Sequence, residues 1–308
     1  MSASAPLPGS QLLRNRHQFR WRSTIAMAVC LVVLAGVGLY TPLGQGLDTV
    51  MMAAITSLEM PQFLTITASV PLLVVLAVLV AAIAIVRRRY ALAFRALVVI
   101  AGANGTTQLL KLLLIRPYFG VGFDLENSFP SGHATFAASL GIALIVVAPT
   151  GWRLAAAFAA TLWIASMGFA VVQLGWHRPS DVLGAICVCV LWGMVLAPVE
   201  ERQRRFPFLQ KLSFIGGQLL LEAALVLTIA GAVGGYADLR MAASFYEFST
   251  LPGTWVEVCL VVAVVLWIVG AAGLGCLLVD RLCATPSEFM KQPAHGDKAG
   301  QSAVCGSE

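Results

Sequence analysis

The sequence predicts an all-α fold, a polytopic membrane bundle of eight transmembrane helices. Hydrophobic residues make up 59% of the 308 residues and charged residues only 11%, whereas a soluble globular protein carries about 25% charged residues. The hydrophobic residues also gather in long runs, and about 20 such residues cross the ~30 Å hydrocarbon core of a bilayer. We therefore expect an integral membrane protein whose surroundings are membrane lipids, and nothing in the composition indicates a nucleic-acid partner.

Eight apolar runs are predicted to form the helices. In chain order they cover residues 24–40, 63–86, 91–115, 131–149, 154–175, 180–198, 213–234 and 255–279. We expect residues 23–199 to form a six-helix core and residues 200–280 to add two C-terminal transmembrane helices. The polar tails, residues 1–22 and 281–308, are predicted to be cytoplasmic and largely disordered.

Local signals support several of the helix boundaries. The basic run Arg87–Arg89 ends the second helix, and Pro149 ends the fourth. Ser131 is suited to the N-cap of the fourth helix, and Pro179 to the first turn of the sixth.

The basic residues predict the orientation of the bundle, because cytoplasmic loops carry an excess of Lys and Arg. Of the 20 Lys and Arg residues, 16 fall on one side of the predicted helices. The other side holds Lys111, Arg116, Arg178 and Arg240. We therefore place both termini in the cytoplasm, and the compact chain favours a bacterial plasma membrane.

This topology brings a group of polar residues to one depth at the outer face of the membrane. The group consists of Lys111, Arg116, His133, His177, Arg178 and Asp181. Ionisable residues at membrane depth are costly and are candidates for function. Taken singly, each has a simpler interpretation: a cation that reaches the interface, a histidine that caps a helix, or an acid in a first helical turn.

The segment from His177 to Asp181 has the spacing of a nucleophile and its orienting acid. They are four positions apart, about one helical turn, so the carboxylate can reach the imidazole. A carboxylate on one ring nitrogen fixes the tautomer and leaves the other nitrogen free to attack. The start of this helix also offers N–H groups and a positive dipole end to an anion.

The segment from Ser131 to His133 suits a phosphate in a related way. Gly132 allows the backbone to approach a ligand closely, Ser131 can donate to a phosphate oxygen, and His133 can protonate a leaving oxygen as general acid. Lys111 and Arg116 follow the third helix and can hold phosphate oxygens. Together these residues indicate phosphoryl transfer through a phosphohistidine on His177, with no metal or other cofactor.

The quoted motifs resemble those of the type-2 phosphatidic acid phosphatase superfamily, which are Lys-x6-Arg-Pro, Pro-Ser-Gly-His and Ser-Arg-x5-His-x3-Asp. The resemblance covers roughly residues 24–198, with the motifs in the expected order and at the expected helix ends. It implies phosphate binding at Lys111 and an oxyanion site at Ser131 and Gly132. It further implies that His133 is the acid, His177 the nucleophile and Asp181 its orienter.

Two motifs depart from the family pattern. The arginine expected seven residues after the lysine falls on Tyr118, and an Arg-Pro pair occurs two residues earlier, at Arg116. The Ser-Arg pair of the third motif falls on Ala170 and Val171. Two residues are possible replacements for the lost cation, Arg178 and Gln173.

We therefore predict a hydrolase for a lipid phosphate or diphosphate, such as phosphatidic acid or a polyprenyl diphosphate, with its site at the outer face. The alternative is a weak or inactive family member that binds lipid phosphates. A transporter is disfavoured. Transporters often carry inverted repeats and broken helices near the midplane, whereas this sequence shows no clear repeat and its ionisable residues fall at the membrane edge. The sequence leaves the lipid and the oligomeric state open.

Overall fold

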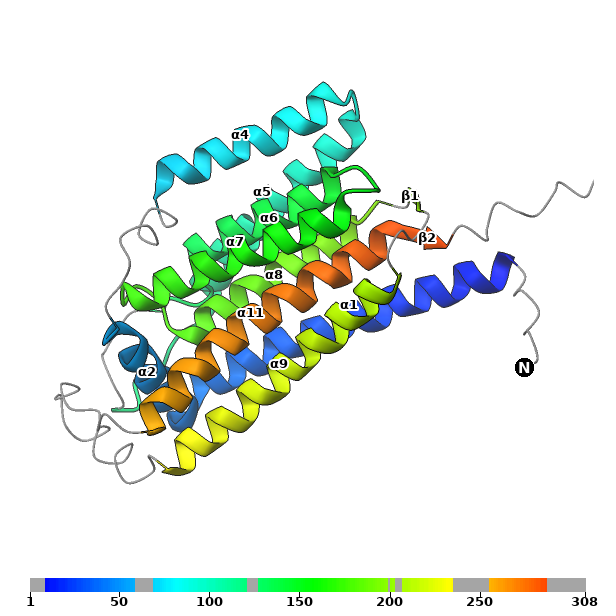
Figure 1. Cartoon of the computed structure of the whole chain (residues 1–308). Helices are drawn as coiled ribbons and strands as arrows, with labels where there is room; N and C mark the ends of the chain where they lie inside the picture. Colours follow the sequence, from blue (N-terminus) through cyan, green and yellow to red (C-terminus); the bar gives the residue numbers. More distant parts are fainter. Residues whose placement is uncertain are drawn as a thin grey trace, which may run out of the picture.

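The computed structural model describes residues 9–58, 69–120, 127–198, 200–202, 207–234 and 255–286. The helices of the first half are α1 (Gly9–Tyr40), α2 (Pro42–Thr56), α4 (Val70–Val86), α5 (Tyr90–Leu113) and α6 (Gly132–Val147). Those of the second half are α7 (Arg153–Gln173), α8 (Pro179–Leu196), α9 (Pro207–Gly234) and α11 (Trp255–Cys283). Figure 1 shows them packed side by side in a bundle, which confirms the predicted all-α membrane fold.

All eight predicted helices are present, with some differences in length. Within the described residues, six helices are long and apolar enough to cross a membrane, whereas two shorter apolar helices cover Val74–Val86 and Gly132–Val147. The first part of the predicted helix 63–86 lies outside the described residues. Large apolar side chains such as Val32, Val86 and Leu112 are 70%, 81% and 82% exposed, as expected of a surface that faces lipid.

Two differences from the prediction concern the N-terminal region. Helix α1 begins at Gly9, so residues 9–22 are helical and the expectation of a disordered tail is wrong there. The short helix α2 was not predicted, because its stretch is interrupted by Gln45 and Asp48 and does not form a long apolar run. Its start has ordinary helix signals, with Pro42 in the first turn and the Thr41 hydroxyl accepting from Gly44 N at 3.0 Å.

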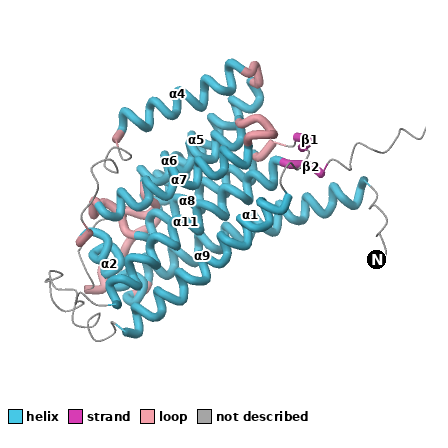
Figure 2. Tube along the Cα trace, in the orientation of Figure 1, coloured by secondary structure: helices cyan, strands magenta, loops and turns pink. Residues whose placement is uncertain are grey.

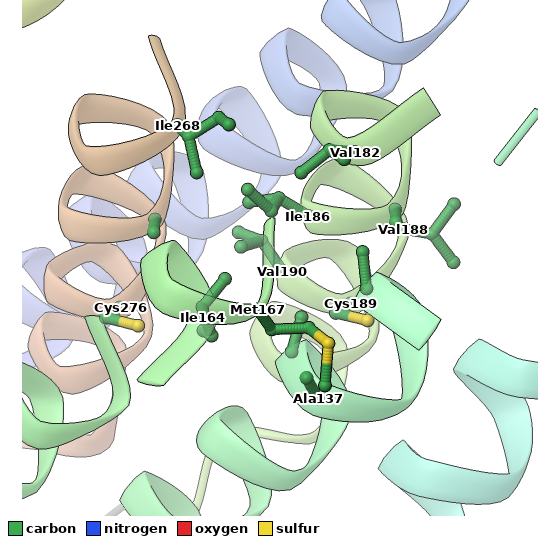
Figure 3. Close-up of a cluster of buried hydrophobic side chains, with 14 of the residues drawn as sticks. Ala137, Ile164, Met167, Val182, Ile186, Val188, Cys189, Val190, Ile268 and Cys276 are labelled. Carbon is green, nitrogen blue, oxygen red and sulfur yellow. The ribbon is translucent and has the colours of Figure 1, made fainter. Parts of the chain in front are cut away.

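Helix α8 lies at the centre of the bundle. In its most hydrophobic window 78% of residues are buried, compared with 11% for α1. Figure 3 shows its Val182, Ile186 and Val190 among side chains of α7 and α11, including Met167 and Ile268. The last predicted helix, α11, therefore packs into the same apolar core as α7 and α8.

Glycines let the central helices approach one another closely. A Cβ atom on Gly275 of α11 would lie 2.4 Å from a methyl carbon of Val190 on α8. A Cβ atom on Gly193 of α8 would lie 2.5 Å from a methyl carbon of Ile142 on α6. Small residues at such crossings allow tight van der Waals packing between membrane helices.

Arginine side chains form hydrogen bonds between helices at the end of the bundle predicted to be cytoplasmic. Arg95 donates to the carbonyl of Leu196 at 2.9 Å, and Arg16 to that of Leu282 at 2.6 Å. Arg153, fully buried, donates to the carbonyl of Ile145 at 3.2 Å. Carbonyls near the C-terminus of a helix lack helical partners and favour cations. The same end holds two three-residue strands, β1 (Glu200–Arg202) and β2 (Ala284–Pro286), which pair in parallel (Figure 2).

Candidate active site

The first turn of α6 carries the Pro-Ser-Gly-His segment. Ser131 is the N-cap, and its hydroxyl accepts from Ala134 N at 3.2 Å. The backbone N of Ser131 donates to the carbonyl of Asp181 at 2.9 Å. This bond joins the starts of α6 and α8, so the two motifs predicted to act together lie side by side.

The turn between α7 and α8 sets the position of His177. Gly175 has a φ of +70°, a left-handed conformation that suits glycine at a helix C-terminus. The backbone N–H groups of Trp176 and His177 then donate to the carbonyl of Val171, at 3.1 and 3.2 Å. Pro179 stands in the first turn of α8, where its missing N–H costs no helical bond.

The two predicted catalytic histidines lie close together. Their ring centroids are 6.4 Å apart, and the ring of Trp176 lies 5.3 Å from that of His133. The His177 side chain is 11% exposed. Lys111 lies beside the first turn of α6, because a Cβ atom on Gly132 would be 3.8 Å from the Nζ atom of Lys111. Both imidazoles and one ammonium group therefore surround one small region at the start of α6.

Asp181 is the buried acid next to His177. Its Oδ2 atom lies 3.7 Å from His177 Nδ1, beyond hydrogen-bond distance. The same oxygen accepts from the Ser128 hydroxyl at 2.5 Å and from Arg178 N at 3.0 Å. Two donors thus hold the carboxylate in place, one from the α5–α6 connection and one from the N-cap of α8.

Arg116 meets the carboxylates of this region. Its Nη2 atom lies 3.9 Å from Asp181 Oδ1 and 3.9 Å from Asp48 Oδ2, and its side chain is only 3% exposed. It also donates to the Gly38 carbonyl at 3.4 Å and to the Ser128 hydroxyl at 3.5 Å. The structure therefore brings Arg116 to the predicted site as an ion-pair partner, and its contact with a phosphate stays a prediction.

Sequence reasoning missed Asp48, the acid of α2. Its side chain accepts from the backbone N of Ser180 at 3.0 Å, and from the Ser180 hydroxyl as well. Burial and the nearby Asp181 carboxylate raise the pKa of Asp48 from 3.8 to about 7, although the Ser180 hydrogen bonds and Arg116 act in the opposite direction. The sequence signal that could have identified Asp48 is the presence of an acidic residue in an apolar stretch next to a predicted membrane helix.

The structure also describes the residues at the positions of the absent Ser-Arg pair and the two possible replacements for its cation. Ala170 and Val171 are fully buried apolar residues of α7. Gln173 uses its amide nitrogen to donate to the Leu58 carbonyl at 2.6 Å. Arg178 is the N-cap of α8 and is 2% exposed. All eight predicted site residues thus lie at one end of the bundle, while their individual roles stay predictions.

A comparison with protein-family models agrees with the motifs. Residues 92–205 match the model of the PAP2 superfamily. The predicted resemblance is therefore confirmed, and the matched residues include both histidines, Lys111 and Asp181, whereas α2 with Asp48 lies before them.

A comparison with solved structures finds a PAP2-type phosphatidylglycerolphosphate phosphatase from Bacillus subtilis. The two chains are 20% identical, and the match covers 56% of this chain and 93% of the other, with a TM-score of 0.46. A comparison with curated proteins finds no match.

Proposed function

We propose that this PAP2-type protein hydrolyses a lipid phosphate or diphosphate through a phosphohistidine on His177, at the outer face of the membrane. The family match supports a phosphatase role in general. The observation that carries the finer proposal is the pair of imidazoles, 6.4 Å apart between ring centroids, with Asp181 on the Nδ1 side of His177.

The first step forms a bond between His177 Nε2 and the phosphorus atom. Asp181 lies 3.7 Å from Nδ1, and in the proposed complex it closes on that nitrogen, so the other nitrogen faces the substrate. The bond between phosphorus and the leaving oxygen breaks, and His133 gives that oxygen a proton, which releases a lipid alcohol or a lipid monophosphate.

The second step frees the enzyme. His133, now neutral, takes a proton from water, and the hydroxide attacks the phosphorus atom of the phosphohistidine. The P–N bond breaks, its electron pair returns to His177, and inorganic phosphate leaves. Lys111 and the N–H groups in the first turn of α6 stabilise the charge on the phosphoryl oxygens during both steps.

The alternative is a family member that binds lipid phosphates but hydrolyses them weakly or not at all. The observation that favours it is the burial of Ala170 and Val171 at the positions of the family Ser-Arg pair. Loss of one charge-assisted bond to a transition state lowers a rate by roughly 100-fold.

Phosphate release by the purified protein tests the proposal. The substrates are phosphatidic acid and a polyprenyl diphosphate in mixed micelles, with vanadate as inhibitor. We expect His177→Ala to abolish release and to lose the acid-labile phosphoryl label that the wild-type protein retains after rapid quenching. His17→Ala is the matched control, because His17 lies on α1 beside Trp21, 3.2 Å from its indole nitrogen. Equal activity in the wild-type protein and His177→Ala would overturn the phosphohistidine mechanism, and lipid binding without turnover would favour the alternative.

A further inference from the structure

A buried network of charged and polar side chains extends from α2 to His177. It consists of Asp48 on α2, Arg116 after α5, and Ser180 and Asp181 in the first turn of α8. We propose that Asp48 is a positioning residue, which holds the start of α8 and Arg116 so that Asp181 stays aligned with His177. This inference rests on the proposed function and adds a residue from outside the family-model segment.

The first part of the argument is the contact between Asp48 and Ser180. Both donors of Ser180, the backbone N–H and the hydroxyl, point to one carboxylate, and the backbone distance is 3.0 Å. The first N–H groups of a helix have no partner within it. Asp48 therefore caps α8 from a separate helix and restrains the residue directly before Asp181.

The second part of the argument is the contact of Arg116 with the carboxylates of both Asp48 and Asp181. One guanidinium nitrogen lies 3.9 Å from an oxygen of Asp48 and 3.9 Å from an oxygen of Asp181. The two carboxylates therefore compete for one buried cation. Without the charge of Asp48, Arg116 is free to close on Asp181 and to draw that carboxylate away from His177.

The close fit of α1 supports a dedicated arrangement. A Cβ atom on Gly38 would lie 3.0 Å from the Ser180 hydroxyl oxygen and 3.7 Å from Asp48 Oδ2. The Gly38 carbonyl also accepts from Arg116 at 3.4 Å. Helices α1, α2 and α8 thus enclose the pair of Asp48 and Ser180, and no bulk solvent separates these groups.

Steady-state kinetics with Asp48→Asn test the inference. The variant keeps the shape of the side chain and removes its charge. Because Asp48 contacts Ser180 and Arg116 and is proposed to act through them, we expect kcat to fall 10- to 30-fold while KM stays within 2-fold. Ser180→Ala should lower kcat 3- to 10-fold with the same unchanged KM. The double variant should lose little more than Asp48→Asn alone, because both changes break one contact.

The matched control is Asp280→Asn, which changes an acid that is 1% exposed and accepts from Gln210 at 2.9 Å at the other end of the bundle. It should keep the wild-type kcat. A folded Asp48→Asn with wild-type kcat, equal losses in both Asn variants, or additive losses with Ser180→Ala would each overturn the inference. If Asp48→Asn does not fold, a folded Ser180→Ala with wild-type kcat overturns it instead. Failure of the proposed function has a different signature, since the wild-type protein itself would then release no phosphate.

Discussion

The packing of Gly184 against Phe129 links the core of α8 to the segment that precedes the predicted site residues Ser131 and His133. Phe129 is fully buried and comes two residues before Ser131. A Cβ atom on Gly184 would lie 2.4 Å from two ring carbons of Phe129. Carbon atoms in contact are 3.5–4.0 Å apart, so Gly184→Ala must displace the ring by about 1 Å. Because Phe129 is only two residues before Ser131, we expect the displacement to reach the segment that carries Ser131 and His133.

We expect Gly184→Ala to lower kcat by about 100-fold, because a misplacement of about 1 Å in an active site costs a rate of that order. Overpacking should also lower the free energy of unfolding by about 1–3 kcal/mol. The matched control is Gly193→Ala on the same helix, where the new Cβ would lie 2.5 Å from Ile142. Nine residues of helix place it about 13 Å further from the site.

The assay measures both kcat for phosphate release and the thermal midpoint in detergent for the two variants. Gly193→Ala should lose stability to a similar extent and keep a kcat within about 3-fold of the wild-type value. Two results would refute the reasoning. Gly184→Ala could fold and keep the wild-type kcat, or both variants could lose kcat equally, which would make stability the cause.

Two further predictions concern the acids of the site. Ser128→Ala removes the donor 2.5 Å from Asp181 Oδ2, and we expect kcat to fall about 10-fold. The control is Ser57→Ala, which loses a hydrogen bond to Glu257 and should keep the wild-type kcat. Equal kcat values for both variants and the wild-type protein would contradict this prediction. The pKa of Asp48 is about 7 in the folded protein against 3.8 for the free side chain, so the folded state binds the proton of Asp48 more tightly than the unfolded state does. The contribution of Asp48 to the free energy of unfolding therefore falls as the pH rises from about 4 to about 7, by at most about 4 kcal/mol. The thermal midpoint of Asp48→Asn should therefore fall less over this range than that of the wild-type protein, and identical pH profiles would count against a buried, titrating Asp48.

The regular parts of the fold could be predicted from the sequence because they depend on local signals. Long apolar runs predicted the membrane helices, and Ser131 and Pro179 begin α6 and α8 as their residue types indicated. The convergence of His133 and His177 followed from topology, since His133 lies in the first turn of α6, His177 comes just before α8, and both helices start at the same side of the bundle.

The remaining features depend on contacts between distant segments, which no local pattern specifies. The contact between Asp48 and Ser180 joins residues 132 positions apart, and the environment of Arg116 depends on how α2 packs against α8. The helical start of α1 was missed for a related reason. Its polar residues suggested a free tail, but Arg16 and Arg20 donate to carbonyls at the ends of α11 and α8, and these tertiary bonds stabilise the helix.

The proposed enzyme would carry out phosphoryl transfer without the arginine of the family's third motif, so other groups must supply the positive charge. Arg116 is paired with Asp181 and Asp48, and the position of the missing arginine is the buried Val171. The N-termini of α6 and α8 meet where Ser131 N donates to the Asp181 carbonyl. A helix N-terminus is equivalent to roughly half a positive charge, and at α8 the carboxylates of Asp48 and Asp181 already lie against it. In the proposed enzyme, the start of α6 and the ammonium group of Lys111 provide the positive potential that a phosphate requires.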